Sequence, residues 1–431
     1  MGHATVRGPE FDVAVVGGGP VGLITALALA RVGANAVVLA APHRPAGVAD
    51  DTRTAALFHG SIALLRALGV WPGLAPHCAP LAAMRMIDDT GGLLRAPEVV
   101  FVAREMGLSE FGWNVPQAAL MRELSLHAAA HPGVSMIATA GVQAVTHGDG
   151  TVELATSEGT RVSARLVAAC DGRRSICREA AGISCEETAY DQVAVTTAFD
   201  HMRPHGGVST ELHRRAGPCT VVPLPGARSS LVWVERPEVA RRLAAMPEAD
   251  FRRRLGDSLQ GLLGGIGEIA PRATFQLARI AASTLAARRT VLVGEAGHVL
   301  PPIGAQGLNL SLRDAATLAD IVGDRLAAGG NPGDGVVLDA YDRQRRTDVA
   351  TRSAAIHAMN TSLLSELLPV HLARGAGLHV AAAIGPVRRA MMRLGMEPAA
   401  LLPRLMRGET GAQPPAATAA RASVAETAGR P

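Results

Sequence analysis

The sequence predicts an α/β fold in which a Rossmann-like domain carries an inserted antiparallel β-sheet and a helical C-terminus. Three observations predict this fold. A glycine-rich turn separates a buried-strand run from a helix near the N-terminus. Short strand-like runs fill residues 183–275, and helical periodicity follows Tyr341. The 431 residues are enough for two connected domains with extensions.

The composition narrows the classes of function. Hydrophobic residues make up 48% of the chain and charged residues 19%, and all 42 basic residues are arginine. A net charge of +4 without a basic block argues against a nucleic-acid partner. The five cysteines include no CxxC pair, which argues for a reducing compartment and against structural zinc. We therefore expect neither a metal site nor nucleic-acid binding.

The sequence shows no targeting or membrane-spanning segment. Residues 1–10 are polar, and the apolar run after them contains glycines, unlike a signal peptide. No uninterrupted apolar stretch reaches the length of about 20 residues that spans a bilayer. We expect a cytoplasmic location, with peripheral contact to the inner membrane as an additional possibility.

The turn near the N-terminus is the first element of the predicted site. Gly17, Gly19 and Gly22 match G-x-G-x-x-G between a strand and a helix. Gly17 permits the tight turn, Gly19 lets a pyrophosphate approach, and Gly22 lets the helix pack on the sheet. This context predicts a dinucleotide ligand. No second fingerprint follows a strand, which argues against a separate Rossmann domain for a nicotinamide.

The second strand lacks one expected part. An acid that hydrogen-bonds the adenosine ribose usually stands about 20 residues after the glycines. Leu39, Ala40 and Ala41 occupy that place. Either the ribose is held in another way, or the affinity for the dinucleotide is reduced.

A second glycine-rich segment precedes a late helix. Pro301 and Pro302 stiffen this segment, while Gly304 and Gly307 allow a ligand to approach the backbone. Apolar residues recur at helical spacing from Leu308, so the ligand would meet a helix N-terminus, which favours an anionic group. On its own the segment does not exclude a plain loop before a helix.

An Asp-Gly pair follows a strand in the middle of the chain. At a strand end, Asp171 can hydrogen-bond ribose or water-bridged phosphate, and Arg173 or Arg178 can neutralise phosphate charge. An isolated Asp-Gly pair is more often an ordinary turn.

In these three motifs the sequence resembles the flavoprotein monooxygenases that share the para-hydroxybenzoate hydroxylase fold. That family has a G-x-G-x-x-G motif, a middle Asp-Gly and a late GDAAH..PP..GQG.N motif, and here they occur in the same order at 17–22, 171–172 and 294–309. Segments 50–71, 93–99 and 190–195 are most similar to the ubiquinone-biosynthesis hydroxylases.

The resemblance implies an FAD cofactor. The implied cofactor-binding residues are Gly17, Gly19, Gly22, Arg53, Gln117, Asp171, Glu295, Gly307, Leu308 and Asn309. The first three would contact the pyrophosphate, and Asp171 would lie near it and near the nicotinamide entry path. Arg53 would contact the phosphates or ring, and Gln117 the adenosine side.

The late motif would bind the ribityl chain and the flavin ring. Glu295 replaces the aspartate that usually binds the ribityl chain in this family. Gly307, Leu308 and Asn309 would present backbone N–H groups to the pyrimidine edge, where the helix dipole stabilises reduced flavin.

No catalytic residue is implied beyond the flavin itself. Pro302 would line the substrate side of the ring. We expect His298 to cap or pack the turn, because the family's oxygen chemistry does not need a base there.

The predicted domain boundaries follow from the order of the motifs. The FAD-binding domain would comprise 10–182 and 276–350, the substrate-binding domain 183–275, a helical region 351–408 and a disordered tail 409–431. Segment 84–99 would add a hairpin to the substrate sheet.

The helical C-terminal region combines apolar residues with arginines. This pattern is typical of a membrane surface or a partner groove, but equally of a subdomain with a solvated basic face.

The resemblance implies an FAD-dependent aromatic hydroxylase. NAD(P)H would reduce FAD, O2 would form a flavin C4a-hydroperoxide, and one oxygen atom would pass to a phenolic ring. The implied substrate is a polyprenylated phenol of ubiquinone biosynthesis, and implied assemblies are a ubiquinone-biosynthesis complex or a homodimer.

Two alternatives stay open. The first is a hydroxylase of another aromatic metabolite. The second is a non-catalytic, flavin-poor subunit of a biosynthetic complex, which the absent acid at 39–41 motivates. A flavin halogenase is excluded because it needs a catalytic lysine and the chain has none.

Overall fold

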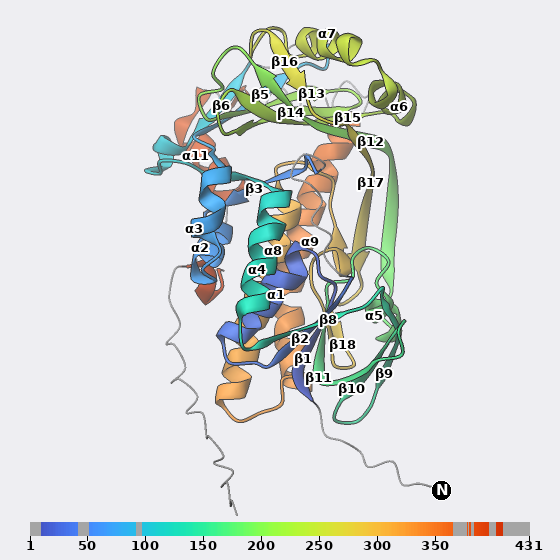
Figure 1. The fold of residues 1–431 in the computed structure, drawn as a ribbon. Helices are drawn as coiled ribbons and strands as arrows, with labels where there is room; N and C mark the ends of the chain where they lie inside the picture. The colour runs from blue at the N-terminus through green and yellow to red at the C-terminus, as the bar shows by residue number, and fades with distance from the viewer. Residues whose placement is uncertain are drawn as a thin grey trace, which may run out of the picture.

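The computed structural model describes residues 10–41, 51–91, 97–364, 377, 379–380, 383–395 and 402–407. A mainly parallel sheet with its helices forms one half of the molecule, and an antiparallel sheet forms the other (Figure 1). The predicted α/β fold with an inserted sheet and a helical C-terminal region is confirmed. The predicted tail 409–431 lies outside the described residues.

The first sheet has the order β18-β19-β11-β1-β2-β8, and β10 and β9 extend it from β11. Strands β19, β11, β1, β2 and β8 are parallel. Helices cover both faces, so its central strands are continuous apolar runs rather than alternating ones. Its strands are β1 (Phe11–Val16), β2 (Ala36–Ala40), β8 (Val134–Ala138), β9 (Val142–His147), β10 (Val152–Thr156), β11 (Arg161–Ala169), β18 (Ala286–Ala287) and β19 (Thr290–Leu292).

The second sheet has the order β20-β17-β12-β15-β14-β13-β5-β6, with β16 beside β12. Long strands β12 and β17 run from this sheet down to the first half of the molecule (Figure 1). Its strands are β5 (Ala83–Asp88), β6 (Val99–Val102), β12 (Cys185–His201), β13 (Val208–Arg214), β14 (Gly217–Leu224), β15 (Arg228–Glu235), β16 (Ile266–Ile269), β17 (Ala273–Ala282) and β20 (His298–Val299). Thus β5 and β6, distant in sequence from 183–275, lie in this sheet.

One face of the second sheet carries its own core. Leu212 and Trp233 of the sheet are buried there against α6 (Pro237–Ala245) and α7 (Glu248–Ser258), which contributes Phe251. Trp233 is therefore a core residue. The opposite face is turned toward the first half of the molecule (Figure 1).

A small sheet and several helices connect the two halves. The order of this sheet is β3-β7-β4. Its strands are β3 (Thr54–Phe58), β4 (Ala79–Pro80) and β7 (Gly112–Pro116). The remaining helices of the described chain are α1 (Pro20–Arg31), α2 (His59–Ala67), α3 (Trp71–Leu74), α4 (Gln117–Ala130), α5 (Ile176–Ala180), α8 (Gln306–Ala327), α9 (Gly335–Leu364) and α11 (Gly385–Gly395), and the 3-10 turns are η1 (Ala75–His77), η2 (Ala103–Met106), η3 (Gly294–Ala296) and η5 (Arg404–Met406).

Helix α9 joins the first half of the molecule to the second sheet. Near its end, Nδ1 of His357 lies 2.7 Å from the Tyr190 hydroxyl, and Asn360 donates to Gln192 at 2.9 Å. Tyr190 thus anchors a helix. Among the described helices, none combines the length and the apolar character that crossing a membrane requires.

Candidate active site

The ends of three parallel strands form the floor of the site. Register places Val16 of β1 beside Ala169 of β11, and Ala169 beside Leu292 of β19. The segments that follow these strands carry the three motifs predicted from the sequence. They therefore meet at one edge of the first sheet, where α/β proteins bind ligands.

The first turn is a cradle of glycines at the N-terminus of α1. Gly17 has φ +116°, and a Cβ there would lie 2.3 Å from the carbonyl oxygen of Cys170. A Cβ at Gly22 would lie 1.9 Å from the Gly17 carbonyl oxygen, so both positions require glycine. At Gly19 a Cβ would meet nothing within 4 Å, and no side chain caps the helix. Open space and unpaired N–H groups at this end of α1 suit a phosphate.

Asp171 lies in the neighbouring turn. Its Oδ2 accepts a hydrogen bond from the backbone N–H of Cys177 at 3.2 Å. Its Oδ1 is buried and has no hydrogen-bond partner among the described residues. A buried carboxylate oxygen without a partner is costly, which makes this atom a candidate for a ligand hydroxyl or water.

The two arginines after Asp171 differ in what they contact. The Arg178 guanidinium is buried and donates to the carbonyls of Ala296 and Arg173, so it joins two turns and does not face a phosphate. Arg173 is half-exposed, and its Nε lies 3.4 Å from Oε2 of Glu295. Of the two, Arg173 is available at the edge of the site.

Arg53, Gln117 and Glu295 come from three different segments. Arg53 pairs with Asp51 through two hydrogen bonds of 2.7 and 2.6 Å, and its guanidinium lies 5.7 Å from the centre of the Phe275 ring. The bond to Asp51 raises the pKa of Arg53, and the charge of Glu295 adds to this effect. The backbone N–H of Gln117 donates to the Arg53 carbonyl at 2.9 Å, which fixes the start of α4 beside this segment.

The proline and glycine segment ends in a tight turn before α8. Gly304 has φ +63°, and Ala305 adopts the left-handed conformation with φ 55° and ψ 28°. Helix α8 begins at Gln306, two residues before the predicted start. Its first N–H groups, including those of Gly307 and Leu308, have no partner within the helix. A Cβ at Gly307 would meet nothing within 4 Å, so the turn faces open space.

Asn309 stabilises this turn through its fully buried side chain. Oδ1 accepts from the Phe58 amide at 2.9 Å and from the Ser61 hydroxyl at 2.8 Å. Nδ2 donates to the carbonyls of Ala56 and Ala305 at 2.8 and 2.7 Å. The backbone N–H of Asn309 comes directly after those of Gly307 and Leu308 in the first turn of α8. The side chain thus holds α8 against β3 and α2.

A buried network of charges supports the η3 turn. Asp314 accepts from the Gly294 amide at 3.0 Å, His298 Nε2 lies 2.6 Å from Oδ2, and Arg345 Nε lies 2.7 Å from Oδ1. Burial alone would raise the pKa of Asp314, but His298 and Arg345 hold it below the usual value. His298 therefore packs the turn, as predicted.

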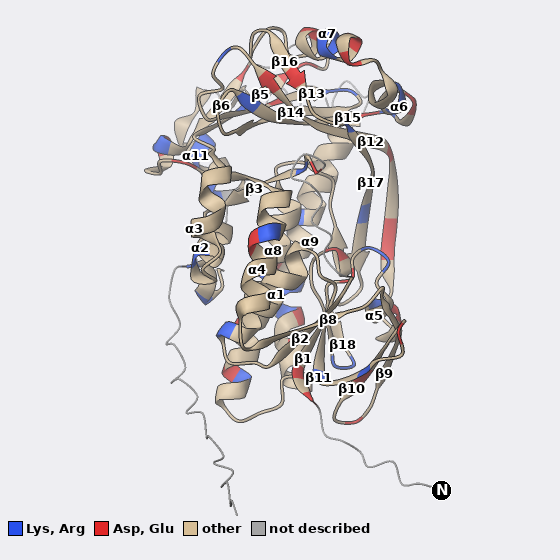
Figure 2. Cartoon of the chain, in the orientation of Figure 1, with Lys and Arg blue, Asp and Glu red and all other residues tan. Residues whose placement is uncertain are grey.

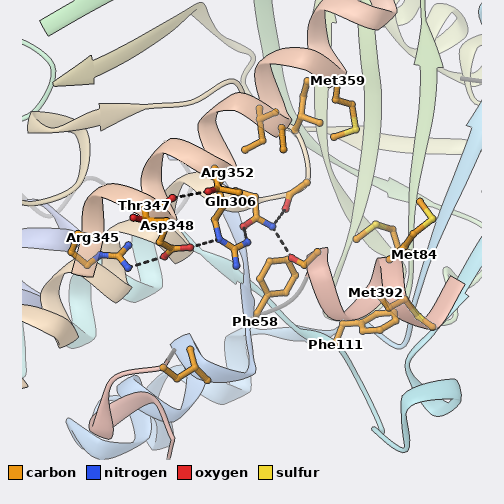
Figure 3. Close-up of a pocket in the computed structure, with 18 of the residues that line it drawn as sticks. Phe58, Met84, Phe111, Gln306, Arg345, Thr347, Asp348, Arg352, Met359 and Met392 are labelled. Atoms are coloured by element: carbon orange, nitrogen blue, oxygen red, sulfur yellow. Dashed lines mark hydrogen bonds and ion pairs between the residues drawn. The ribbon is translucent and has the colours of Figure 1, made fainter. Parts of the chain in front are cut away.

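A cavity of about 1070 Å3 lies between the second sheet and helices α8, α9 and α11. Figure 3 shows Phe58, Met84, Phe111 and Met392 at one end of it and Arg345, Asp348 and Arg352 along the other. The methionine and phenylalanine side chains in the lining of the whole cavity are Phe58, Met84, Met86, Phe101, Phe111, Met359, Met391 and Met392. Ile303 and Gly304 belong to the same lining, so the cavity adjoins the turn before α8. Pro302 is exposed and is not part of this lining.

Gln306 joins the walls of the cavity. Its Nε2 donates to the carbonyls of Gly304 and Gly395, at 3.1 and 2.9 Å, and its Oε1 accepts from Arg352 at 2.7 Å (Figure 3). Arg388 of α11 pairs with Glu105 at 2.9 Å. Helix α11 is thus fixed over the apolar end of the cavity.

Comparison with known proteins identifies the family. The FAD binding domain family matches residues 10–355. The chain is 34% identical over 410 residues to the ubiquinone hydroxylase UbiL of Rhodospirillum rubrum, an alignment that covers 92% of each chain. The chain belongs to the FAD-dependent aromatic monooxygenases. The monooxygenase is also 28% identical to the 3-demethoxyubiquinol 3-hydroxylase of Escherichia coli, over 89% of this chain and 98% of the relative.

Solved structures share the fold of the monooxygenase. The p-nitrophenol 4-monooxygenase PnpA of Pseudomonas putida aligns with a TM-score of 0.72 at 23% identity, over 89% of this chain and 96% of that one. The HpxO protein of Klebsiella pneumoniae, solved with FAD and uric acid, aligns with a TM-score of 0.67 at 19% identity, over 89% and 96% of the two chains.

The residues of the monooxygenase fit the FAD that its family binds. The glycine cradle has room for a pyrophosphate, Asp171 offers an unpartnered oxygen, and the α8 N-terminus offers N–H groups. The sequence motifs gave no signal for Arg345, which pairs with Asp314, or for the methionines of the cavity, because these residues meet their partners only through the tertiary fold.

Proposed function

We propose that this monooxygenase hydroxylates the aromatic ring of a polyprenylated phenol in ubiquinone biosynthesis. The observation that carries the proposal is the cavity beside the α8 turn, whose apolar end is built largely from methionine and phenylalanine side chains. Flexible methionines adapt to an irregular apolar ligand such as a prenyl chain. The relatives named ubiquinone hydroxylase and 3-demethoxyubiquinol 3-hydroxylase support the same class of substrate.

The two parts of the site have separate tasks in this proposal. When bound, FAD takes electrons from NAD(P)H and activates O2. Gly17, Gly19 and Gly22 would leave room for its pyrophosphate, and the N–H groups of Gly307 and Leu308 would stabilise negative charge on the flavin.

The cavity orients the substrate and excludes water. Its apolar end under α11 binds the prenyl chain, and the phenolic ring lies toward Gly304, at the turn before α8. Exclusion of water matters because water would discharge the activated oxygen before transfer.

One further relative supports a hydroxylase of another aromatic metabolite. The Protoasukamycin 4-monooxygenase of Streptomyces nodosus is 30% identical over 366 residues. A non-catalytic subunit without bound flavin has less support, because the FAD binding domain family matches residues 10–355 and the glycine cradle leaves room for a pyrophosphate.

The experiment is incubation of the purified protein with FAD, NAD(P)H, 18O2 and a polyprenylated phenol in detergent, followed by mass spectrometry. We expect yellow protein and one 18O atom added per product ring. Product from a short aromatic acid and none from the prenylated phenol favours the other-metabolite alternative. Colourless protein that takes up no added FAD, with no product, favours the non-catalytic subunit.

We also propose peripheral membrane contact through α11. Ile384, just before this helix, and Met391 are exposed apolar residues, at 44% and 41%, and Figure 2 shows basic residues on the helix. An amphipathic helix with arginines binds anionic lipid surfaces, which would also bring a prenylated substrate to the cavity. Vesicles with anionic lipid should co-sediment the full chain but not a form lacking 363–431. Equal sedimentation of both forms would contradict this contact.

The oligomeric state of the protein is the last part of the proposed function. We infer that the protein works either as a homodimer or within a ubiquinone-biosynthesis complex. Size-exclusion chromatography with light scattering distinguishes these states, and a monomer that is fully active alone would contradict both.

A further inference from the structure

A buried acid that lines the cavity lies beside a buried histidine on the same strand of the second sheet. Glu211 and His213 are two residues apart on β13, with exposed fractions of 8% and 3%. His213 Nε2 lies 2.7 Å from Oε1 of Glu211. Neither residue belongs to the sequence motifs described above.

The alternation of side chains along β13 places Glu211 and His213 on the same face of the strand. Leu212, between them, is buried with Trp233 in the core under α6 and α7. Because successive side chains point to opposite faces of a strand, Glu211 and His213 lie on the face that is turned to the first half of the molecule. Glu211 is accordingly part of the cavity lining, together with Ile303 and Gly304 of the turn before α8.

The surroundings of Glu211 are mainly apolar. Met86 of β5 and Thr220 of β14 are its register neighbours, while Asp88 of β5 is the register neighbour of His213. Three charged residues of α9 that line the same cavity, Arg345, Asp348 and Arg352, are bonded to one another. The other charged residues in the lining are Asp320, Arg343 and Arg407. A carboxylate in apolar surroundings is costly without a partner, and His213 supplies one.

A polar pair in an apolar cavity is a candidate for acid-base chemistry. Resting on the phenolic substrate class proposed above, we propose that Glu211 is a catalytic base and that His213 positions it. The O–H bond of the phenol breaks, its proton bonds to a carboxylate oxygen of Glu211, and the electron pair stays on the phenolic oxygen. The resulting phenolate makes the ring more electron-rich and a better acceptor of the transferred oxygen.

A purely structural pair would behave differently. Such a pair would stabilise the sheet, and its loss would lower activity equally at all pH values and for phenols of any acidity. A base, in contrast, becomes dispensable when the phenol ionises in solution, which for a tyrosine-like phenol occurs at about pH 10. The dependence on pH and on substrate acidity therefore separates the two roles.

The experiment compares the FAD-loaded full chain with Glu211→Gln, Glu211→Asp and His213→Asn. Thr210→Val, on the same strand but the opposite face, is the matched control. At neutral pH we expect Glu211→Gln to hydroxylate a prenylated phenol about 10²-fold to 10⁴-fold more slowly, the range for loss of a general base. The deficit should shrink as the pH rises toward that of phenol ionisation, and Glu211→Asp should recover part of the rate.

A second readout needs no turnover. The wild type should bind a prenylated phenol more tightly than the methyl ether of that phenol, because the phenol O–H donates to the Glu211 carboxylate, and Glu211→Gln should lose most of this preference. An equal preference in the two proteins, or an equal loss of rate at every pH, would overturn the proposal. If the wild type forms no hydroxylated product, the proposed function fails, while the binding measurement still decides whether Glu211 accepts a hydrogen bond from the phenol.

Discussion

The glycine cradle at the edge of the first sheet and the cavity under the second sheet are built in different ways. The cradle consists of backbone: positions where a Cβ would collide with a carbonyl, and helix N-termini whose N–H groups face open space. The cavity consists of side chains from β5, β13, α8, α9 and α11. Backbone geometry suits a cofactor shared by a whole family, whereas side chains set the substrate of one member.

A bulky side chain in the glycine cradle should abolish FAD binding. Gly22→Val places side-chain atoms where the Gly17 carbonyl lies, since even a Cβ would be 1.9 Å from it. We expect no FAD in the purified protein, measured by its absorbance. Gly19→Ala, which has free space, should fold normally and bind FAD more weakly. Normal FAD content in Gly22→Val would show that the cradle is not where we place it.

The charge network around Asp314 connects the cradle to the cavity wall. Arg345→Met takes away a buried partner of both Asp314 and Asp348, and we expect the free energy of unfolding to fall by about 3–5 kcal/mol. Arg346→Met, which removes an ion pair whose arginine is 57% exposed, should cost no more than about 1 kcal/mol. Urea unfolding measures both. Equal effects would contradict the structural role of the network.

A substitution at the N-terminus of α8 should affect the reaction of the cofactor and leave the stability of the fold unchanged. Gly307→Leu adds a side chain to the open space at this turn, so we expect turnover to fall about 10²-fold or more, as for loss of an oxyanion donor. The melting temperature should stay unchanged. Ala327→Leu adds similar bulk at the other end of α8 and should leave turnover intact. Full turnover in Gly307→Leu would refute the placement of the flavin edge.

A substitution in the cavity lining should weaken substrate binding and leave FAD binding unchanged. Met359→Gln places an amide in the apolar lining, and we expect KM for a prenylated phenol to rise about tenfold, the lower end for one altered apolar contact. FAD content should not change. A fall in FAD content together with an unchanged KM would contradict the assignment of cofactor binding to the glycine cradle and of substrate binding to the cavity.

The smallest effect concerns acid stability. Because the pKa of Asp314 is lowered in the folded state, its contribution is present above the unfolded value of about 3.9 and is lost as pH falls through the folded pKa. The difference in unfolding free energy between the wild type and Asp314→Asn should therefore be largest near neutral pH and shrink at low pH. A difference that does not vary with pH would argue that Asp314 is not charged.

The contrast between the two regions also explains what the sequence could predict. Gly17, Asp171 and Gly307 stand in short motifs with fixed spacing, and the strands that precede the three motifs end side by side, as the motifs predict. The fold class followed from the same motifs and from strand and helix periodicity.

The cavity was not predictable from such motifs. Met84 and Met359 are far apart in sequence and look like ordinary core residues, and Glu211 looks like one more charge in a strand. Their meeting depends on the parallel pairing of β5 with β13 and on the path of α9, both of which are long-range contacts. Arg178 shows the opposite error, because its position in a motif suggested a phosphate contact, while burial directs it to two carbonyls.

The most direct test is a crystal structure of the protein with FAD and a prenylated phenol bound. The structure should show the pyrophosphate at Gly19, the pyrimidine edge of the flavin at the N–H groups of Gly307 and Leu308, and the phenolic oxygen at Glu211. A flavin bound away from both helix N-termini, or a phenol outside the cavity, would contradict the account.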